Sequence, residues 1–209
     1  MQNDIKDSIV DWPESDKLVF DGNIIEKTNI RANDLDERIE WTDNRMISCE
    51  VHSNNMSEFS FNSNAWQSVE WTKADIYQST IEDTVFENCK LTGLHARDLG
   101  LSDWRNIDSD CVDCKFEKVR IETMLFEQSQ LNSVTFKNCE IEDFTITNCS
   151  FENCTFESIS TTKVKWKNVH LKNCNLTTVN MSDMKLTDWN GAGLTIDGDA
   201  ALEAALKSR

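Results

Sequence analysis

The sequence predicts an all-β fold, a solenoid of square coils with twenty residues in each coil. The first observation behind this prediction is a period of five. The frame that steps by five residues from Trp41 to Ile196 has 32 positions, and all of them are apolar except Asn106, Thr161 and Gly191. At the chain's 39% apolar composition, chance would fill roughly 12 of these positions. A period of five fits neither an α-helix nor an ordinary strand, so it indicates a repeat architecture.

The second observation is a smaller apolar residue two positions before many frame residues, as Cys139, Cys149 and Cys154 show. The third is compensation in volume. Where the frame residue is small, the residue two positions earlier is large, and the pairs are Leu94 with Ala96, Trp104 with Asn106, Ile159 with Thr161, and Trp189 with Gly191. Two side chains that share one close-packed layer are expected to compensate in this way. Both positions are therefore predicted to point inward.

Five residues with two pointing inward form one short strand and a corner, and four such units close a coil of twenty residues. Backbone hydrogen bonds then join successive coils at the ~4.8 Å spacing of strands. The frame from Trp41 to Ile196 makes eight such coils. Residues twenty apart stack directly, so Phe116, Phe136 and Phe156 are predicted to form an aromatic stack.

The period is clearest in the motifs FENCKL, FKNCEI, ITNCSF, FENCTF and LKNCNL. In them the chain resembles the pentapeptide-repeat proteins, whose repeat is a small residue, then Asp or Asn, then Leu or Phe, then two free positions. The resemblance is strong from Trp41 to Ile196 and weak from Phe20 to Leu35. Here Cys or Val replaces the usual Ala, which is similar to the Cys-rich variant in Qnr quinolone-resistance proteins and the microcin immunity protein. The resemblance implies a right-handed quadrilateral β-helix.

Residues 1–19 have no clear period and are expected to cap the first coil, because an end coil exposes core and unpaired strand edge. The β-helix is expected to span residues 20–198. From Phe20 to Leu35 the five-residue step continues in a different frame, and a step of six follows to Trp41. One extra residue at a corner would reset the register in this way, which gives about nine coils in all.

Residues 199–209 are predicted to form a short C-terminal helix. Asp199 is a good N-cap, the alanines and leucines after it favour a helix, and Lys207 suits the C-terminal end. Leu202 and Leu206 lie on one face, and so short a helix needs a surface to pack on. That surface is either the chain's own last coil or a second copy. Related pentapeptide-repeat proteins dimerise end to end through such an element, so the resemblance implies a homodimer contact at these leucines.

The net charge of −16 argues against direct binding to nucleic acid or to anionic membrane surfaces, because both require a basic footprint. It suits a soluble protein or one that meets a basic partner. No apolar run is long enough to span a membrane, and no signal peptide is seen at the N-terminus. We therefore expect a cytoplasmic protein.

The chain has eight cysteines, and all of them fall on inward positions. Free cysteine packs as a small hydrophobe, so buried reduced thiols are expected rather than disulfides or zinc ligands. Cys111 and Cys114 have a metal-like spacing, but no second pair or histidine lies in register to complete a site.

No catalytic constellation, cofactor motif or metal motif appears in the sequence. His52, His95 and His170 fall at different corners of the chain's path. Carboxylates are abundant, but a solenoid without inserted loops offers no concave pocket to desolvate a pair of them. We therefore expect a protein that is not an enzyme and that needs no cofactor or metal.

We number the four sides of the coil by their frame residues: the first side is centred on 41, 61 and so on to 181, and the second, third and fourth begin at 46, 51 and 56. The first side is mostly acidic, with Glu82, Asp83, Asp103, Glu122, Glu140, Glu142 and Asp143 against the basic Arg120 and Lys163. Like charges stacked at ~4.8 Å repel one another. The side is therefore either a merely solvated acidic face or a surface that serves a partner.

The functional hypothesis for this side is DNA mimicry, because a rod with regular carboxylates offers a basic groove something like a duplex backbone. The resemblance implies the same, since several pentapeptide-repeat proteins bind DNA gyrase or topoisomerase IV and some protect it from quinolones or peptide poisons. Qnr proteins use inserted loops for this, and the unbroken frame lacks them. The closer analogy is with gyrase-binding members that have no loops.

A second candidate surface is apolar. Val85, Ile107 and Leu125 are expected to point outward on consecutive coils beside the second side. They are either scattered surface residues or a patch for a protein partner. The alternative function is thus a structural or scaffold protein, for example a bacterial or phage effector, that binds a partner unrelated to DNA.

Overall fold

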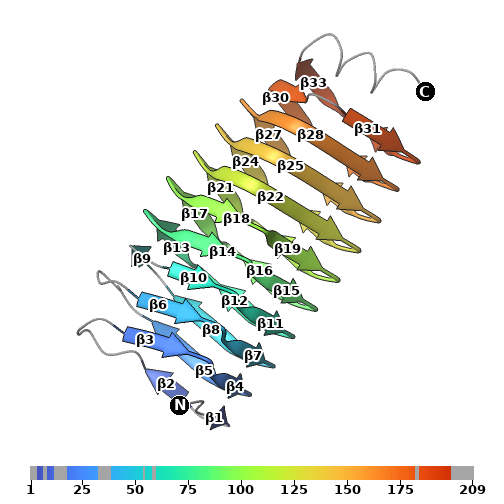
Figure 1. The fold of residues 1–209 in the computed structure, drawn as a ribbon. Coiled ribbons are helices and arrows are strands. Elements are labelled where there is room, and N and C mark those ends of the chain that lie inside the picture. The colour runs from blue at the N-terminus through green and yellow to red at the C-terminus, as the bar shows by residue number, and fades with distance from the viewer. Residues whose placement is uncertain are drawn as a thin grey trace.

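The computed structural model describes residues 4–6, 9–11, 18–32, 39–53, 55–57, 60–181 and 184–198, and in them the chain forms a parallel β-solenoid of about 8 turns (Figure 1). The described part of the chain contains no helix that could cross a lipid bilayer. The expected C-terminal helix, with Leu202 and Leu206, lies outside the described residues. The right-handed course of the coil stays a prediction.

The strands form four stacks, which correspond to the four predicted sides. The first side contains β3 (Leu18–Asp21), β6 (Ile39–Thr42), β10 (Ser60–Asn62), β14 (Thr80–Glu82) and β18 (Gly100–Ser102). The second contains β1 (Asp4–Lys6), β4 (Ile24–Glu26), β7 (Arg45–Ile47), β11 (Ala65–Gln67), β15 (Val85–Glu87), β19 (Trp104–Ile107) and β31 (Met184–Thr187). Three longer strands run through both of these sides, namely β22 (Arg120–Glu127), β25 (Glu140–Thr147) and β28 (Ser160–Lys167).

The other two sides follow the same plan. The third is a separate sheet of 10 strands: β2 (Ile9–Asp11), β5 (Asn29–Ala32), β8 (Glu50–Ser53), β12 (Glu70–Thr72), β16 (Lys90–Thr92), β20 (Asp110–Val112), β23 (Gln130–Asn132), β26 (Ser150–Glu152), β29 (His170–Lys172) and β32 (Asn190–Ala192). The fourth contains β9 (Asn55–Ser57), β13 (Asp75–Tyr77), β17 (His95–Arg97), β21 (Lys115–Glu117), β24 (Thr135–Lys137), β27 (Thr155–Glu157) and β33 (Thr195–Gly198). The strand β30 (Asn175–Met181) runs from the fourth side into the first.

The register between coils confirms the predicted frame. Phe61 pairs in parallel with Trp41 below it and with Ile81 above it, so residues twenty apart stack directly. Phe20 pairs with Trp41, which is twenty-one residues away, and this places the extra residue between the first two coils as predicted. Ile5 of β1 pairs with Ile25. The parallel pairing therefore reaches into residues 1–19, and the capping role of that stretch stays a prediction.

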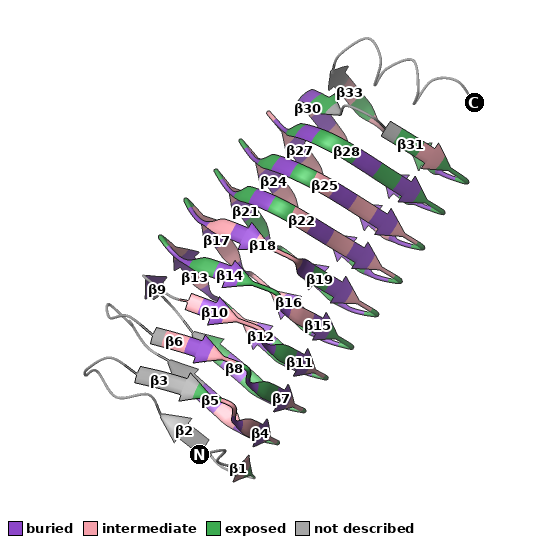
Figure 2. Cartoon of the chain, viewed as in Figure 1, coloured by how far each residue is buried: buried purple, intermediate pink, exposed green. Residues whose placement is uncertain are grey.

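The core is a column of buried side chains enclosed by the four stacks, and along most strands whose burial is described, buried residues alternate with half-buried or exposed ones (Figure 2). The predicted aromatic stack is present. The ring centroids of Phe116 and Phe136 are 4.9 Å apart, and those of Phe136 and Phe156 are 5.2 Å apart, with the rings within 9° of parallel. Three of the four compensating pairs share the core as expected, as Trp104 and Asn106 do, whereas in the last pair Trp189 is buried and Gly191 is exposed. Two inward residues in every five thus fill one continuous core.

Where the small inward position holds a cysteine or a serine, the side chain donates hydrogen bonds to backbone carbonyls. Cys139 Sγ donates to the carbonyl oxygens of Lys137 and of Phe116 in the coil below, and Ser109 Oγ makes the equivalent bonds to Ile107 and Phe86. These bonds satisfy corner carbonyls, which explains why Cys and Ser replace a plain Ala. All eight cysteines are free and buried, as predicted. Burial raises the pKa of Cys89, Cys139 and Cys149 to about 11.

Most corners place one residue in the left-handed backbone region, as Asp83 does with a φ of 45° and Asp103 with 50°. Asp, Asn and Ser dominate these positions because short polar side chains tolerate that region. The corner between the first and second sides changes at β22, β25 and β28, where Thr123, Asp143 and Lys163 continue an extended strand of 8 residues. The five-residue period alone did not predict this opening of the corner.

Candidate functional site

The acidic residues of the first side form a column along the solenoid axis. Ile81, Leu101, Ile121 and Ile141 pair in sequence from coil to coil. The residues that follow them are Glu82, Ser102, Glu122 and Glu142, so these stack in the same order at ~4.8 Å per coil. The three glutamates are exposed, whereas the isoleucines beneath them are buried. The strand geometry therefore turns a sequence spacing of twenty into a line of carboxylates.

Most of the acidic residues of the first side have no counter-ion in contact among the described residues. Within the part of the chain that the structure describes, no lysine, arginine or histidine nitrogen lies within 4.0 Å of the carboxylates of Glu82, Asp83, Glu122, Glu140 or Glu142. The polar contact on the column is a neutral one, because Ser102 Oγ donates to Glu122 Oε2 at 3.1 Å. The carboxylates of this column are thus exposed to solvent, and the described residues in contact with them do not neutralise their charge.

Two predicted acidic residues differ from the rest because they are paired. Asp103 lies 3.9 Å from Arg105. Asp143 sits on the extended corner of β25, where its side chain is only 23% exposed and its carboxylate lies 3.4 Å from Lys165 Nζ and 4.0 Å from Lys163 Nζ. Thr145 Oγ1 also donates to Asp143 at 3.0 Å. Asp143 therefore contributes less free charge to the first side than its neighbours do.

A shallow hollow of about 210 Å³ lies on the first side, along the strands β22, β25 and β28. It is lined by Arg120, Ile121, Glu122, Glu140, Ile141, Glu142, Ser160 and Thr162. Three of these are the unpaired carboxylates of β22 and β25, and Arg120 is the single basic residue among them. The hollow is open to solvent along the same face as the acidic column.

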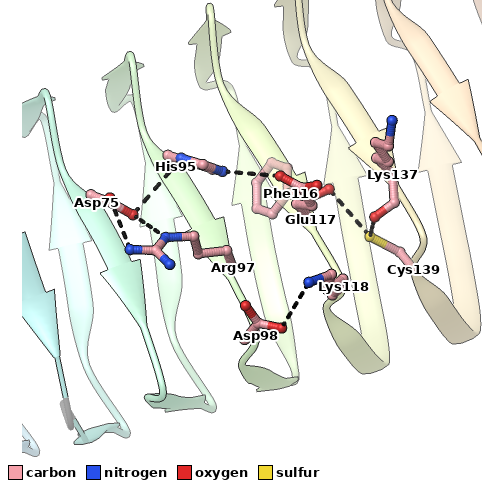
Figure 3. A network of polar contacts seen from close by, with 9 residues as sticks. All are labelled: Asp75, His95, Arg97, Asp98, Phe116, Glu117, Lys118, Lys137 and Cys139. Carbon is pink, nitrogen blue, oxygen red and sulfur yellow. Dashed lines mark hydrogen bonds and ion pairs between the residues drawn. The ribbon is translucent and has the colours of Figure 1, made fainter.

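The fourth side carries a polar network that the sequence analysis did not identify (Figure 3). Arg97 binds Asp75 of the coil below through two hydrogen bonds, at 3.0 and 3.3 Å, and its guanidinium lies 4.4 Å from the ring centroid of Tyr77. The contact with Asp75 raises the pKa of Arg97. The ring of His95 lies between Asp75, at 3.8 Å, and Glu117, at 3.6 Å.

The same side continues with pairs of opposite charge. Lys118 Nζ lies 3.7 Å from Asp98, and Lys137 Nζ lies 2.9 Å from Glu157. The hydrogen bond from Lys137 to Glu157 raises the pKa of the lysine. Opposite signs at a spacing of twenty residues were the signal in the sequence that could have revealed this network.

The predicted apolar residues lie on consecutive coils of the second side and are half-buried, but they do not stack on one another. Val85 pairs with Arg105, which pairs in turn with Leu125. Ile107 lies between Glu87 and Glu127. Charged side chains thus separate the three apolar residues from each other.

The three histidines are not brought together. His52 and His170 lie on the third side many coils apart, and His95 lies on the fourth side. In the described residues no three His, Cys, Asp or Glu side chains gather as a metal site would require. The absence of enzymatic activity stays a prediction, as does the dimer contact at Leu202 and Leu206.

Comparison with known proteins supports the fold class. The chain has the parallel β-solenoid fold seen in pentapeptide-repeat proteins. A trypsin-treated form of QnrB1, a plasmid-mediated fluoroquinolone resistance protein, matches 99% of this chain and 94% of its own length with a TM-score of 0.50 at 13% sequence identity. At this identity the likeness shows the fold alone.

Two further solved structures have lower TM-scores. Full-length QnrB1 covers 100% of this chain and 99% of its own length with a TM-score of 0.48 at 13% identity. HetL, a pentapeptide repeat protein involved in heterocyst differentiation regulation from a Nostoc cyanobacterium, covers 91% of this chain and 88% of its own length with a TM-score of 0.35 at 10% identity. No family model and no curated protein matches the sequence.

Proposed function

We propose that this chain is a binding module without enzymatic activity, whose first side occupies the basic DNA-binding groove of a DNA-handling protein such as DNA gyrase or topoisomerase IV. The observation that carries the proposal is the column with Glu82, Glu122 and Glu142, exposed carboxylates that have no counter-ion within 4.0 Å among the described residues. Repulsion between stacked like charges costs stability, and nothing in the fold requires it. A basic groove would neutralise the column.

The regular negative charge of the first side supports this partner. Seven carboxylates and Arg120 lie on the four coils from Glu82 to Asp143, and two of the carboxylates, Asp103 and Asp143, are ion-paired. At ~4.8 Å per coil, the remaining net charge amounts to one per ~5 Å, which is sparser than the ~3.4 Å between phosphates along one DNA strand. The first side therefore offers a basic groove a regular row of negative charge, and binding by this side is expected to weaken with salt.

The proposal places the protein in the cytoplasm, where its target works. Binding in place of DNA inhibits the enzyme, and the same binding protects it from a poison that needs the DNA complex. The structural likeness to QnrB1, a fluoroquinolone resistance protein, favours testing protection as well as inhibition. Immunity to a peptide poison would follow from the same competition.

The test is a supercoiling assay with DNA gyrase, in which the chain is titrated with and without a quinolone. We expect an effect on supercoiling that the variant Glu82→Gln/Glu122→Gln/Glu140→Gln/Glu142→Gln weakens by at least about tenfold, since it removes most of the unpaired charge. The matched control is Glu50→Gln/Glu70→Gln/Glu152→Gln/Glu157→Gln, which removes the same charge from the third and fourth sides and leaves the effect intact. Equal loss in both variants, or no effect of the wild type at low salt, contradicts the proposal.

The alternative function is a scaffold protein that binds a partner unrelated to DNA through the second side. Val85, Ile107 and Leu125 favour it, because they are half-buried apolar residues on consecutive coils of the second side. This function predicts binding that is insensitive to salt and survives the glutamate variant. Replacing the three apolar residues with serine would abolish such binding and leave any effect on gyrase unchanged.

A further inference from the structure

The strand β28 carries a row of lysines in a chain of net charge −16. Its second half reads KVKWK, and Lys163, Lys165 and Lys167 are exposed while Val164 and Trp166 between them are buried. Three positive charges therefore project from one strand at every second residue. Because the corner at Lys163 is extended, the row continues straight across the junction of the first and second sides.

A fourth lysine extends the row toward the C-terminal end. Lys185 of β31 pairs in register with Lys165 of β28, and the two strands are neighbours (Figure 1). We call Lys163, Lys165, Lys167 and Lys185 the lysine row. Asp143 is paired with Lys163 and Lys165, but within the described residues neither Lys167 nor Lys185 has a carboxylate within 4.0 Å. The register thus places Lys165 and Lys185 side by side. The carboxylate of Asp143, which lies near Lys165, is shared with Lys163.

Stacked like charges are unfavourable here as they are on the acidic first side. Asp143 compensates part of this charge, as the register partner of Lys163, whereas Thr145, Thr147 and Thr187, which stack on Lys165 and Lys167, are neutral. Their hydroxyl groups are neutral donors and acceptors. The surface is therefore polar and cationic, and it is complementary to an anionic partner.

The spacing of the row selects the kind of anion. Residues two apart on a strand are separated by roughly 6.6 Å, so carboxylates at every second residue of an extended peptide match Lys163, Lys165 and Lys167 one to one. Lysine lacks the planar fork that arginine uses for phosphate, and the row contains no aromatic side chain on which bases could stack. A long nucleic acid would also run past the acidic column of the adjoining side.

We propose that the lysine row is a docking surface for an extended acidic peptide segment of a partner protein, with acidic residues at every second position. The segment lies along β28, and Lys185 contacts an acidic side chain at its edge. This surface adjoins the acidic first side, with Lys163 at their junction, and does not depend on the DNA-mimic function. A partner that used both surfaces would be fixed in one orientation on the rod.

The probe is a fluorescent peptide of alternating glutamate and serine, measured by anisotropy at low ionic strength against a peptide of the same composition whose glutamates are contiguous. We expect the alternating peptide to bind more tightly, and Lys163→Gln/Lys165→Gln/Lys167→Gln to weaken it on the order of tenfold. The control Lys73→Gln/Lys90→Gln/Lys115→Gln removes equal charge from the third and fourth sides and should change binding less than about twofold.

A second variant, Lys167→Gln/Lys185→Gln, keeps both lysines that pair with Asp143 and so guards against loss of folding in the triple variant. Equal affinity for the two peptides, or equal loss in the control, overturns the proposal. Tighter binding of a short DNA duplex that the row variants abolish would reassign the surface to nucleic acid. Self-association that they abolish in sedimentation would assign it to a second copy. Either of these two results also overturns the acidic-peptide partner.

Discussion

The first and fourth sides have the same backbone, the same register and the same spacing, but opposite charge patterns. On the fourth side, Arg97, Glu117, Lys137 and Glu157 pair in succession, so each charge lies above one of opposite sign. On the first side the equivalent column carries Glu82, Ser102, Glu122 and Glu142. The comparison shows that the fold accepts either pattern.

The reason is that the coils are held together from within. Backbone hydrogen bonds join each coil to the next, and two buried residues in every five fill the core, whatever the outward residues are. The outward positions are therefore free to serve a partner. The fourth side uses them for internal ion pairs, whereas most carboxylates of the first side, apart from Asp103 and Asp143, have no ion pair among the described residues, which is why we propose binding by the first side.

The largest expected effect is the loss of stability when a core side chain beneath the fourth side or the first side is shortened. Phe136→Ala removes the middle ring of the aromatic stack under the fourth side and is expected to lower the free energy of unfolding by about 3–5 kcal/mol, because it leaves a cavity between two fixed rings. Ile141→Val under the first side should lower it by about 0.5–1.5 kcal/mol. Denaturant unfolding of both variants measures the difference. Similar small losses would show that the stack adds little to the core.

The next largest effect is the loss of stability at high pH that a buried thiol causes. Burial raises the pKa of Cys139, beneath the first side, to about 11 from a reference of 9.0. The unfolded chain therefore ionises this thiol first, so its share of stability is complete below pH 9 and is lost as pH rises toward 11, at about 1.4 kcal/mol per pH unit. Cys139→Val should flatten the decline between pH 9 and 11. Parallel stability curves for variant and wild type would exclude the thiol as a cause.

Reversing one charge tests the two surface patterns directly. Glu117→Lys places a positive charge between Arg97 and Lys137 on the fourth side, so we expect a loss of stability of about 1 kcal/mol. Glu122→Lys on the first side places a positive charge beside Glu142 and should be neutral or stabilising. Thermal unfolding at low salt compares the two. If both variants lose the same stability, the sides do not differ in electrostatics.

Much of the fold could be predicted because it depends on spacing alone. The frame of five fixed the inward residues, the step of six before Trp41 located the extra residue, and the stack of Phe116, Phe136 and Phe156 followed from a separation of twenty. The open corners at Thr123, Asp143 and Lys163 could not be predicted in this way. A corner is set by backbone torsion angles, on which a hydrophobic period carries no information.

The candidate site was predictable in position but not in pairing. The spacing placed Glu82, Glu122 and Glu142 on one side, and the register agrees. The partners of Asp143 depend on how far the side chain of Lys165 reaches across an open corner, which the sequence does not report. The network around Arg97 depends on the order of signs along one column, on which the net charge of a side carries no information.

The smallest expected effect is a change in melting temperature whose direction differs between the two sides. Glu142→Gln removes a carboxylate that stacks on Glu122, so it should raise the melting temperature slightly at low salt. Glu157→Gln removes the partner that Lys137 holds at 2.9 Å, so it should lower it. Each variant removes one negative charge, so the change in net charge is the same and only the local pattern differs. Because salt screens exposed charges, the two shifts should converge toward zero as ionic strength rises. Shifts of the same sign at low salt would mean that net charge, rather than the arrangement of charges on each side, controls stability, and the contrast between the two sides would lose its physical basis.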